Sequence, residues 1–354
     1  MTLTLEEKKQ YDRHLILSEI GKEGQLKLKQ AKVLVIGAGG LGCPVLQYLT
    51  AAGIGTIGII DDDVVDQSNL QRQILFSVDD VGKPKARIAA NRLSGLNPFV
   101  KFDIYSQRLT TKNALELFKK YDVIVDGSDN FSTRYLVNDA SVITNKPVVF
   151  GSIFKFEGQV SVFNYKQGPT YRCLFPNPPK PNEVPNCSEI GVLGVLPGII
   201  GSLQATEVLK IICNIGSVLS GKLLIYKALS MQQITLSFNK NPSNNITTLE
   251  NDYQSFCEIS NEVEEVTFKD YKAQPDKYHL LDVRTYEERE TFHIGGTHIP
   301  LDELEDRLSE IPKNKPLLVY CKSGMRSKQA IKLLEDLHLK TDLSNLKNGV
   351  SECI

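Results

Sequence analysis

The sequence predicts an α/β protein in which a doubly wound, mostly parallel sheet is followed by a second, smaller α/β domain. The first observation is that short apolar runs alternate with helix-like segments over the first part of the chain. Parallel strands read as continuous apolar runs because helices cover both faces of their sheet. The second observation is a polar, turn-rich segment, residues 239–250, after which a new set of strand and helix patterns begins. We therefore expect a first domain over residues 1–240, a linker over 241–261 and a second domain over 262–354.

The strands of the first domain are predicted in chain order from these apolar runs, at residues 32–36, 55–60, 100–105, 121–125, 146–150 and 158–165. The last run alternates apolar and polar residues, which indicates an antiparallel strand. A glycine turn and an apolar helix pattern follow the first strand, and a further helix is expected over 111–120. The second domain contains two predicted strands and a predicted helix, at 278–283, 317–320 and 326–337.

The overall charge is close to neutral, with 41 Lys and Arg residues against 42 Asp and Glu residues. Without a global basic field, no binding to nucleic acid or to an anionic membrane is expected. The longest apolar stretch, residues 192–203, is interrupted by glycines and Pro197 and falls short of the ~20 residues that span a bilayer. The first residues have the character of neither a signal nor a transit peptide. We expect a cytoplasmic protein, or a protein of the organelle stroma if an organelle encodes the chain.

A glycine-rich turn between the first strand and its helix predicts a phosphate-binding site. The turn contains Gly37, Gly39, Gly40 and Gly42. Glycines let backbone N–H groups approach a phosphate at the positive end of the helix. Asp61 ends the second strand, where a carboxylate can accept hydrogen bonds from ribose hydroxyls. On these residues alone, an NAD-dependent oxidoreductase is the default interpretation.

The residues after the second strand favour a nucleoside triphosphate instead. Arg72 and Lys85 add two cations beside the expected ribose, where a nicotinamide site needs an apolar slot. Cations suit a triphosphate whose α-phosphorus is attacked, because the negative charge must be offset. Asp129 follows another strand and places a carboxylate suitable for Mg²⁺ at the same edge of the sheet. Together these residues point to one crevice.

An ordered set of segments over residues 8–236 resembles the molybdopterin-synthase adenylyltransferases and the related thiamin-pathway and ubiquitin-activating enzymes. The segments are GAGGLGCP, SNLQRQILF, VGKPKA, DGSDN, EGQVSVF, YRCLFP and GSLQATEVLK. The resemblance implies a Rossmann-like fold in which Asp61 holds the ribose and Asn69, Arg72 and Lys85 bind the phosphates of ATP. It also implies that Asp129 positions Mg²⁺.

The implied activity is ATP-dependent adenylation of the C-terminal glycine of a ubiquitin-like sulfur-carrier protein. The preferred carrier is the small subunit of molybdopterin synthase, in molybdenum cofactor biosynthesis, and a thiamin or tRNA-thiolation carrier is the alternative. Attack of the carboxylate on the α-phosphorus needs positioning and charge neutralisation but no protein nucleophile. Arg13 matches a family arginine that reaches the γ-phosphate in the neighbouring subunit, which implies a homodimer. A non-catalytic scaffold that only binds a carrier is a further alternative.

The seven cysteines are scattered without a CxxC pair, so reduced thiols are expected rather than a disulfide scaffold. Relatives often hold a structural zinc between two CxxC pairs, but here Thr170 stands where the first cysteine is expected and only Cys173 remains. The second pair is expected around residues 240–257, where only Cys257 is found. We therefore predict no zinc. Cys187 matches a family cysteine that bonds to the activated carrier in some relatives, and a spectator thiol is the alternative.

The second domain carries a cysteine loop, CKSGMRS from Cys321 to Ser327, between a predicted strand and a predicted helix. Inward-pointing N–H groups, the helix dipole and Arg326 would favour a thiolate and then a persulfide. With LDVR and HIGGTHIP upstream, residues 262–350 resemble a rhodanese sulfurtransferase domain. A phosphatase of the related fold uses a loop one residue longer, so the short loop favours sulfur. The resemblance implies a catalytic Cys321 and a sulfur donor such as a cysteine desulfurase or thiosulfate, with an inactive rhodanese fold as the alternative.

Overall fold

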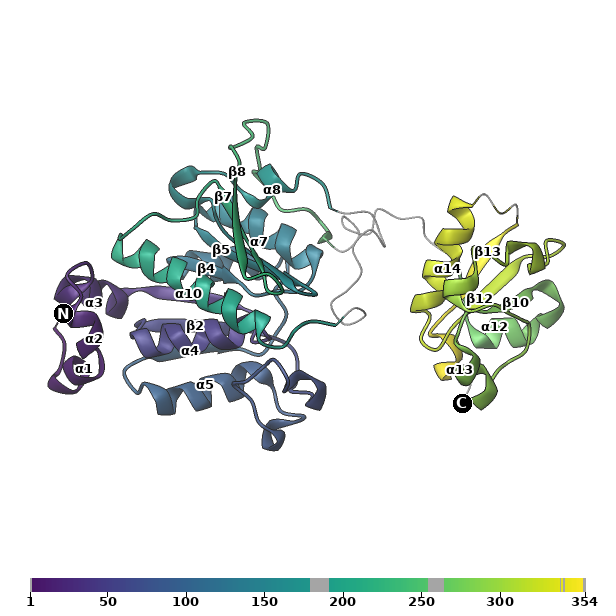
Figure 1. Cartoon of the computed structure of the whole chain (residues 1–354), viewed down its shortest axis with the longest axis horizontal. Coiled ribbons are helices and arrows are strands. Elements are labelled where there is room, and N and C mark those ends of the chain that lie inside the picture. Colours follow the sequence, from purple (N-terminus) through teal and green to yellow (C-terminus); the bar gives the residue numbers. More distant parts are fainter. Residues whose placement is uncertain (1, 179–190, 254–263, 338, 340, 353–354) are drawn as a thin grey trace. The chain divides into compact units, whose positions relative to one another are not determined.

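The computed structural model describes residues 2–178, 191–253, 264–337, 339 and 341–352. The chain forms two compact units, Met1–Glu258 and Ile259–Ile354, and each is described by itself (Figure 1). The first unit contains an eight-stranded sheet and the second a five-stranded sheet. The predicted fold class, a doubly wound, mostly parallel sheet with a second, smaller α/β domain, is confirmed.

The sheet of the first unit has the order β3-β2-β1-β4-β5-β6-β7-β8. Strands β1 to β5 pair in parallel, and β6, β7 and β8 add an antiparallel end. The order changes direction between β1 and β4, which is the switch point where doubly wound sheets bind ligands. The strands are β1 Lys32–Ile36, β2 Thr56–Ile60, β3 Lys101–Tyr105, β4 Val123–Asp126, β5 Val148–Phe154, β6 Glu157–Phe163, β7 Lys222–Lys227 and β8 Gln232–Ser237.

Helices cover both faces of this sheet. One hydrophobic core joins the sheet to α3, α4, α5 and α10, and another joins its opposite face to α6 and α7. The helices are α1 Leu5–Gln10, α2 Asp12–Ile16, α3 Gly21–Gln30, α4 Gly42–Ala52, α5 Lys85–Leu96, α6 Ala114–Lys119, α7 Phe131–Thr144, α8 Tyr171–Leu174 and α10 Leu196–Cys213. Short 3₁₀ turns are η1 Gln67–Asn69, η2 Val78–Asp80 and η3 Tyr165–Gln167.

Helix α10 is long and apolar enough to cross a membrane when judged by length and composition alone. Its 18 residues have a mean hydropathy of 1.3, and half of them are buried inside the first unit. There α10 packs against α4, β5 and β6. A core helix passes the same test of length and composition, and the packing of α10 is that of a core helix.

The sequence does not predict the β7–β8 hairpin at the far end of the sheet. All the residues of β8 are exposed, and β7 buries only Leu223 and Tyr226. Strand β8 lacks the continuous apolar run that marks a parallel strand. Strand β7 carries a short apolar run, residues 223–226, which the sequence analysis did not single out.

The chain end of the first unit is fixed to its helices. Tyr253 is buried, and its hydroxyl donates a hydrogen bond of 2.6 Å to Oδ2 of Asp139 on α7. Arg172 on α8 binds the same carboxylate through Nε and Nη2, at 2.7 and 2.8 Å. The segment that leads toward the second unit is therefore anchored up to residue 253.

The second unit has a parallel sheet in the order β11-β10-β12-β13-β9, with α14 packed on β12 and β13. The predicted strands β10 and β12 and the predicted helix α14 agree with the structure within one residue at each end. The elements are β9 Glu264–Val266, α12 Phe268–Ala273, η4 Pro275–Lys277, β10 His279–Asp282, α13 Tyr286–Thr291, β11 Thr297–His298, η5 Leu301–Glu303, η6 Leu308–Glu310, β12 Leu317–Tyr320, α14 Met325–Asp336, β13 Leu343–Leu346 and η7 Gly349–Glu352.

A buried ion pair holds the centre of the second unit. Both side chains are buried, and Arg284 binds Asp282 through Nη2 and Nε at 2.7 and 2.8 Å. Burial raises the pKa of Asp282, but the hydrogen bonds and charge of Arg284 outweigh it, so that the pKa lies below its usual value. The pair therefore stabilises the unit above the pKa of an unfolded aspartate, about 3.9, and this contribution is lost as the pH falls through the lower folded value.

Removing one partner of this pair is expected to destabilise the second unit strongly. Asp282→Ala leaves the Arg284 guanidinium buried without its carboxylate, which costs about 3–5 kcal/mol. Hydrogen exchange of the β12 amides, measured in the full chain, should report this loss. The matched control is Glu303→Gln, because Glu303 pairs with Arg307 at 2.7 Å in a partly exposed position at the surface, where such pairs contribute about 1 kcal/mol or less. Equal loss of protection in both variants would contradict this account of the buried pair.

Candidate functional site

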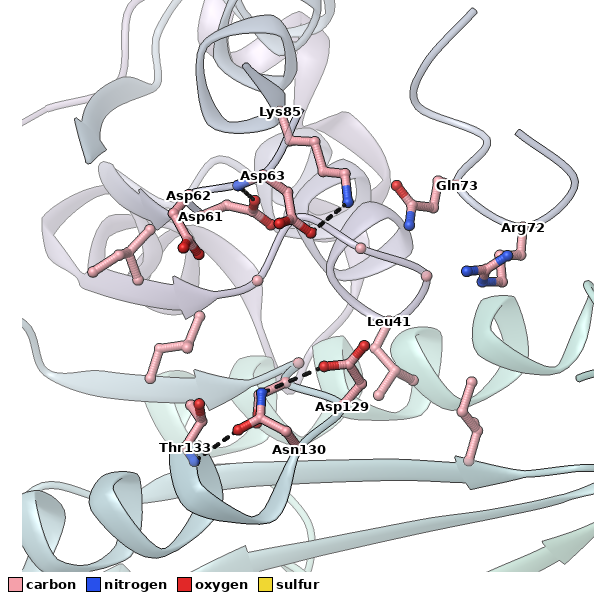
Figure 2. Close-up of a pocket in the computed structure, with 18 of the residues that line it drawn as sticks. Leu41, Asp61, Asp62, Asp63, Arg72, Gln73, Lys85, Asp129, Asn130 and Thr133 are labelled. Atoms are coloured by element: carbon pink, nitrogen blue, oxygen red, sulfur yellow. Dashed lines mark hydrogen bonds and ion pairs between the residues drawn. The ribbon is translucent and has the colours of Figure 1, made fainter. Parts of the chain in front are cut away.

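A pocket of about 650 Å³ opens at the carboxyl ends of β1, β2 and β4. Its lining includes the last residues of β1 and β2, Ile36 and Ile60, and the loop that follows β4. This is the place where the direction of the strand order changes, so the topology itself puts a binding crevice here. The charged side chains that the sequence analysis singled out can therefore be placed around one cavity (Figure 2).

The glycine turn forms the floor of the pocket. Gly37, Gly39 and Gly40 line it, and α4 begins at Gly42. Gly37 has a φ of +87°, which a side chain would strain. A Cβ at Gly42 would lie 1.9 Å from the Gly37 carbonyl oxygen. The turn can close only with glycine at both positions, and closure is what directs the N-terminus of an 11-residue helix toward the cavity.

Asp61 is held at the end of β2 by two backbone N–H groups. Ala38 donates to Oδ2 at 2.7 Å, and Asp63 donates to Oδ1 at 2.8 Å. Burial raises the pKa of the Asp61 carboxyl, and these two hydrogen bonds oppose the rise. The carboxylate is fixed to the glycine turn on one side and to the β2–η1 loop on the other. It therefore lines the pocket in one defined orientation.

Three nitrogen-bearing side chains lie along one side of the pocket, namely Lys85, Gln73 and Arg72 (Figure 2). Lys85 is the first residue of α5 and is buried, and its Nζ lies 3.0 Å from Oδ2 of the exposed Asp63. Arg72 Nη1 donates to the Ser68 carbonyl oxygen at 3.2 Å. Two cations thus face a cavity whose floor is a helix N-terminus, which makes this side of the pocket a site for an anion.

Asp129 and Asn130 lie across the pocket from this side (Figure 2). Asp129 is exposed, and the nearest part of α7 is capped by Asn130, whose Oδ1 accepts from the N–H of Thr133 at 2.9 Å. Beneath them, Asp126 is buried and accepts two hydrogen bonds from Ser128. Burial raises the pKa of Asp126, and Arg134 and Ser128 oppose the rise. The buried carboxylate fixes the loop, and the exposed one remains available to a ligand.

Several of the predicted site residues lie outside this lining. Asn69 does not line the pocket, and its Oδ1 accepts from the N–H of Asp66 at 3.3 Å at the start of η1. Arg13 is exposed on α2 and does not line the pocket of its own chain. Cys187 lies outside the described residues. The pocket therefore brings together Asp61, Arg72, Lys85 and Asp129 with the glycine turn.

The pocket also contains polar residues that the sequence analysis did not single out. Gln73 is buried, and its Oε1 has no hydrogen-bond partner among the described residues. Arg108 and Thr133 line the pocket, as does Arg134, whose Nη2 donates to the Ser128 carbonyl oxygen at 3.3 Å. Gln73 stands within the quoted segment SNLQRQILF, and Arg134 stands four positions after the end of DGSDN. Their nearness to those motifs was the available signal, whereas Arg108 stands in no such motif.

Cys173 lies where two distant segments of the first unit meet. Its Sγ accepts from the backbone N–H groups of Thr170 and Asn241, both at 3.3 Å, and lies 3.7 Å from Nδ2 of Asn244. Burial raises the pKa of Cys173, but these hydrogen bonds outweigh it and lower the pKa overall. Residues 240–257 are where a second cysteine pair is expected. The residues of this segment that contact Cys173 are Asn241 and Asn244. No group of three or more His, Cys, Asp or Glu side chains positioned to hold a metal ion occurs among the described residues.

In the second unit, Cys321 follows β12 at the base of a tight loop that leads into α14. Cys321 is buried, and its Sγ accepts from the N–H of Gly324 at 3.2 Å. Gly324 adopts a φ of +90° at the N-cap of α14, so the loop turns back toward the sulfur at a glycine. Val350, near the chain end, donates its N–H to the Cys321 carbonyl oxygen at 2.9 Å. The end of the domain therefore supports the loop.

Arg326 is paired rather than directed freely at the sulfur. Both terminal nitrogens of its guanidinium bind the Glu288 carboxylate at 2.7 Å. The hydrogen bond from Arg326 lowers the pKa of Glu288 to about 2. Glu288 lies in the first turn of α13, where it forms a capping box with Thr285. The guanidinium expected to favour a sulfur anion is therefore neutralised by a carboxylate. The groups in contact with Cys321 Sγ are the Gly324 N–H and, at 3.4 Å, the Ser327 hydroxyl.

The fold and the two sites define a nucleotide-binding protein of the doubly wound α/β class with a cysteine-loop domain behind it. Residues 11–248 match the model of the ThiF family, and residues 267–353 match that of the rhodanese-like domain. The chain therefore belongs to the ThiF family and carries a C-terminal rhodanese-like domain. Both resemblances drawn from the sequence are confirmed, and the dehydrogenase interpretation is set aside.

The curated relatives include proteins that match both units. A Mycobacterium tuberculosis protein named probable adenylyltransferase/sulfurtransferase MoeZ is 43% identical over 366 residues, which cover 98% of this chain and 93% of that protein. A Thermus thermophilus protein named sulfur carrier protein adenylyltransferase is 51% identical over 268 residues, covering 73% of this chain and 99% of that protein. The crystal structure of E. coli MccB with succinimide matches at a TM-score of 0.59 and 24% identity, over 68% of this chain and 74% of that chain. This last match supports the fold.

Proposed function

We propose that the chain adenylates the C-terminal glycine of a ubiquitin-like sulfur-carrier protein with ATP, and that its rhodanese-like domain then supplies the sulfur. The observation that carries the proposal is the convergence of Arg72, Lys85 and Asp129 on one pocket above the glycine turn. That arrangement offers a helix N-terminus and two cations to a polyphosphate and one carboxylate to its counter-ion. The names of the relatives point to the same two activities.

The chemistry of adenylation follows from what each group does to the phosphates. Attack of the carrier carboxylate on the α-phosphorus forms an acyl adenylate and releases pyrophosphate, and charge moves onto the pyrophosphate as its bond breaks. Arg72 and Lys85 offset that charge from fixed positions, with little reorganisation at the moment of reaction. Asp61 accepts hydrogen bonds from the ribose and so keeps the α-phosphorus in place.

Asp129 fits a magnesium ligand by its donor type and exposure. Mg²⁺ is usually bound through one or two carboxylates together with substrate phosphates and water, so a single exposed carboxylate is sufficient from the protein. Bound there, the ion would neutralise phosphate charge opposite the two cations. Asp129 Oδ1 accepts a 3.4 Å hydrogen bond from Asn130 Nδ2, which holds the carboxylate at the mouth of the pocket.

Lys85 must change partner when a triphosphate binds. In the free protein its charge is balanced by Asp63, which is exposed and can turn into solvent. A phosphate oxygen can replace that carboxylate without leaving the buried ammonium unpaired at any stage. Asp63 thus holds the Lys85 side chain in position until the nucleotide arrives.

The sulfur half of the reaction is assigned to Cys321. Its thiolate would attack the outer sulfur of a donor persulfide or of thiosulfate, forming an S–S bond and releasing the donor's thiol or sulfite. The resulting persulfide would attack the acyl-adenylate carbonyl and displace AMP, giving an acyl disulfide. A second thiolate would then attack the Cys321 sulfur, form a disulfide with it and release the carrier thiocarboxylate. Cys187 remains the candidate for a covalent bond to the carrier.

The experiment that tests the proposal is exchange of labelled pyrophosphate into ATP by the full chain. Exchange should depend on a carrier with a free C-terminal glycine, and a scaffold that only binds the carrier would show none. Presenting molybdopterin-synthase, thiamin-pathway and tRNA-thiolation carriers side by side separates the three branches, and we propose the first. We further propose that the protein is a homodimer in the cytoplasm or an organelle stroma, with Arg13 serving the partner's nucleotide.

We also predict that the purified protein contains no structural zinc. Zinc sites of this type need four thiolate or imidazole ligands, and Cys173 is surrounded by Thr170, Asn241 and Asn244 instead. Metal analysis of protein purified without chelator should give far less than one zinc per chain. A stoichiometric signal that Cys173→Ser abolishes would contradict the prediction.

A further inference from the structure

Two hydrogen bonds at the base of the cysteine loop compete for one proton. The Ser327 hydroxyl lies 3.4 Å from Cys321 Sγ and 2.6 Å from Oδ1 of Asn345, and in both contacts it is placed to donate. A hydroxyl has a single proton, so it can donate to only one of them at a time. The shorter bond, to Asn345, takes the proton. Ser327 can then contact Cys321 only by accepting the S–H of a neutral thiol.

Ser327 and Asn345 are both fully buried, so water cannot supply the hydrogen bond that one of the two contacts lacks. Ser327 and Asn345 are each 0% exposed. Nδ2 of Asn345 makes no hydrogen bond of ordinary geometry among the described residues and interacts only weakly with the Glu265 carboxylate, although a buried amide normally satisfies both its ends. Rotating the amide by half a turn exchanges its oxygen and nitrogen at nearly equal shape. Nδ2 would then donate to the Ser327 oxygen, and the serine proton would be free to point at the sulfur.

The charged groups around this pair set the balance between the two arrangements. Glu265 on β9 is ion-paired with Lys328 at 2.7 Å, and its pKa is lowered mainly by Lys328, with a smaller share from the Asn345 amide. The Glu265 carboxylate favours the orientation in which Asn345 Nδ2 faces it. In that orientation Oδ1 accepts from Ser327, and Cys321 is a thiol. On the loop, Arg326 attracts a sulfur anion but is paired with Glu288. The rotated amide is therefore favoured only when an anion forms at Cys321.

We propose that Ser327 and Asn345 form a buried hydrogen-bond relay that reverses with the state of the Cys321 sulfur. When Cys321 is a thiol, its S–H donates to the Ser327 oxygen, and the Ser327 hydroxyl donates to Asn345 Oδ1. When Cys321 is a thiolate, Asn345 Nδ2 donates to the Ser327 oxygen, and the Ser327 hydroxyl donates to the sulfur. The relay makes Ser327 and Asn345 positioning residues for the nucleophile, because thiolate rather than thiol attacks a sulfur donor. This inference rests on the sulfur-transfer part of the proposed function.

The test is the rate at which Cys321 in the full-length protein is alkylated by iodoacetamide across a pH series, followed by mass spectrometry of its peptide. Ser327→Ala removes the relay, and a hydrogen bond to a charged group is large enough to move the pH of half-maximal alkylation up by about one unit. Asn345→Asp keeps the shape but can only accept, so it should produce a shift at least as large. Ser327→Thr retains a hydroxyl and should restore most of the wild-type profile.

Ser344→Ala is the matched control. Ser344 is a buried serine on β13, next to Asn345, but its hydroxyl donates to Glu264 at 3.3 Å, so its loss should leave the profile unchanged. A wild-type profile in Ser327→Ala overturns the proposal, and so does an equal shift in Ser344→Ala. A shift in Ser327→Ala without one in folded Asn345→Asp overturns the part played by Asn345. Because alkylation needs no ATP, carrier or sulfur donor, this result is independent of whether sulfur transfer itself is observed.

Discussion

Replacing Asp129 with alanine is expected to reduce carrier-dependent exchange of pyrophosphate into ATP by about 100- to 1,000-fold. Asp129 is the exposed carboxylate opposite Arg72 and Lys85 in the pocket. Without it, the Mg²⁺ ion that we propose to balance the phosphate charge would lose its protein ligand, and the two cations alone would have to hold a triphosphate in a reactive geometry. The loss should appear chiefly in the rate of exchange at saturating ATP, because the glycine turn and the cations still bind phosphate.

A matched control distinguishes this effect from a general change in surface charge. Asp79 is an exposed carboxylate on η2 that does not line the pocket, so Asp79→Ala should leave exchange within about twofold of wild type. Undiminished exchange in Asp129→Ala would mean that the nucleotide site has been assigned to the wrong residues. A selective loss of exchange in Asp129→Ala would support the whole arrangement of the pocket.

The sequence predicts the parallel part of the fold well because burial on both faces leaves a strong pattern. The apolar runs at β1 and β2 and the glycine turn between them identify a strand, a phosphate-binding turn and a helix. Strand β8 escapes prediction because all its residues are exposed, whereas β7 has a short apolar run, residues 223–226, that was not singled out. An edge of a sheet that faces solvent carries little apolar signal. Local chemistry thus predicts the part of the sheet that holds the site.

The site itself is predicted as far as charge reveals it. Asp61 and Asp129 are ionic side chains that follow strand ends, and Arg72 and Lys85 are cations in the segment after β2 and at the start of α5. The structure gathers all four around the pocket. Gln73 is neutral, and only three-dimensional packing shows that it is buried with an unpaired amide oxygen beside the cations. The pairing of Lys85 with Asp63 is likewise a property of the fold, since 22 positions separate them in the chain. Residue type can suggest which side chains belong to a site, but their hydrogen-bond and ion-pair partners are known only from the structure.

The two proposed activities should be separable because each depends on groups held within one unit. The nucleotide pocket is lined only by residues of the first unit among those described, and Cys321 is supported by groups of the second, including Gly324 and Ser327. A substitution within one unit is therefore expected to leave the groups that form the site of the other unit in place.

Cys321→Ser tests that separation and carries the second large expected effect. Oxygen in place of sulfur cannot form a persulfide, so formation of carrier thiocarboxylate from a persulfide donor or thiosulfate should fall at least ~1,000-fold. Pyrophosphate exchange should stay within about twofold of wild type, and the carrier should accumulate as its adenylate. Cys213→Ser is the control, because Cys213 is a buried thiol at the end of α10 in the first unit and should leave both activities intact. Thiocarboxylate formation that survives in Cys321→Ser would transfer the sulfur-carrying role to another cysteine, whereas loss of exchange together with sulfur transfer would show that the second unit takes part in adenylation.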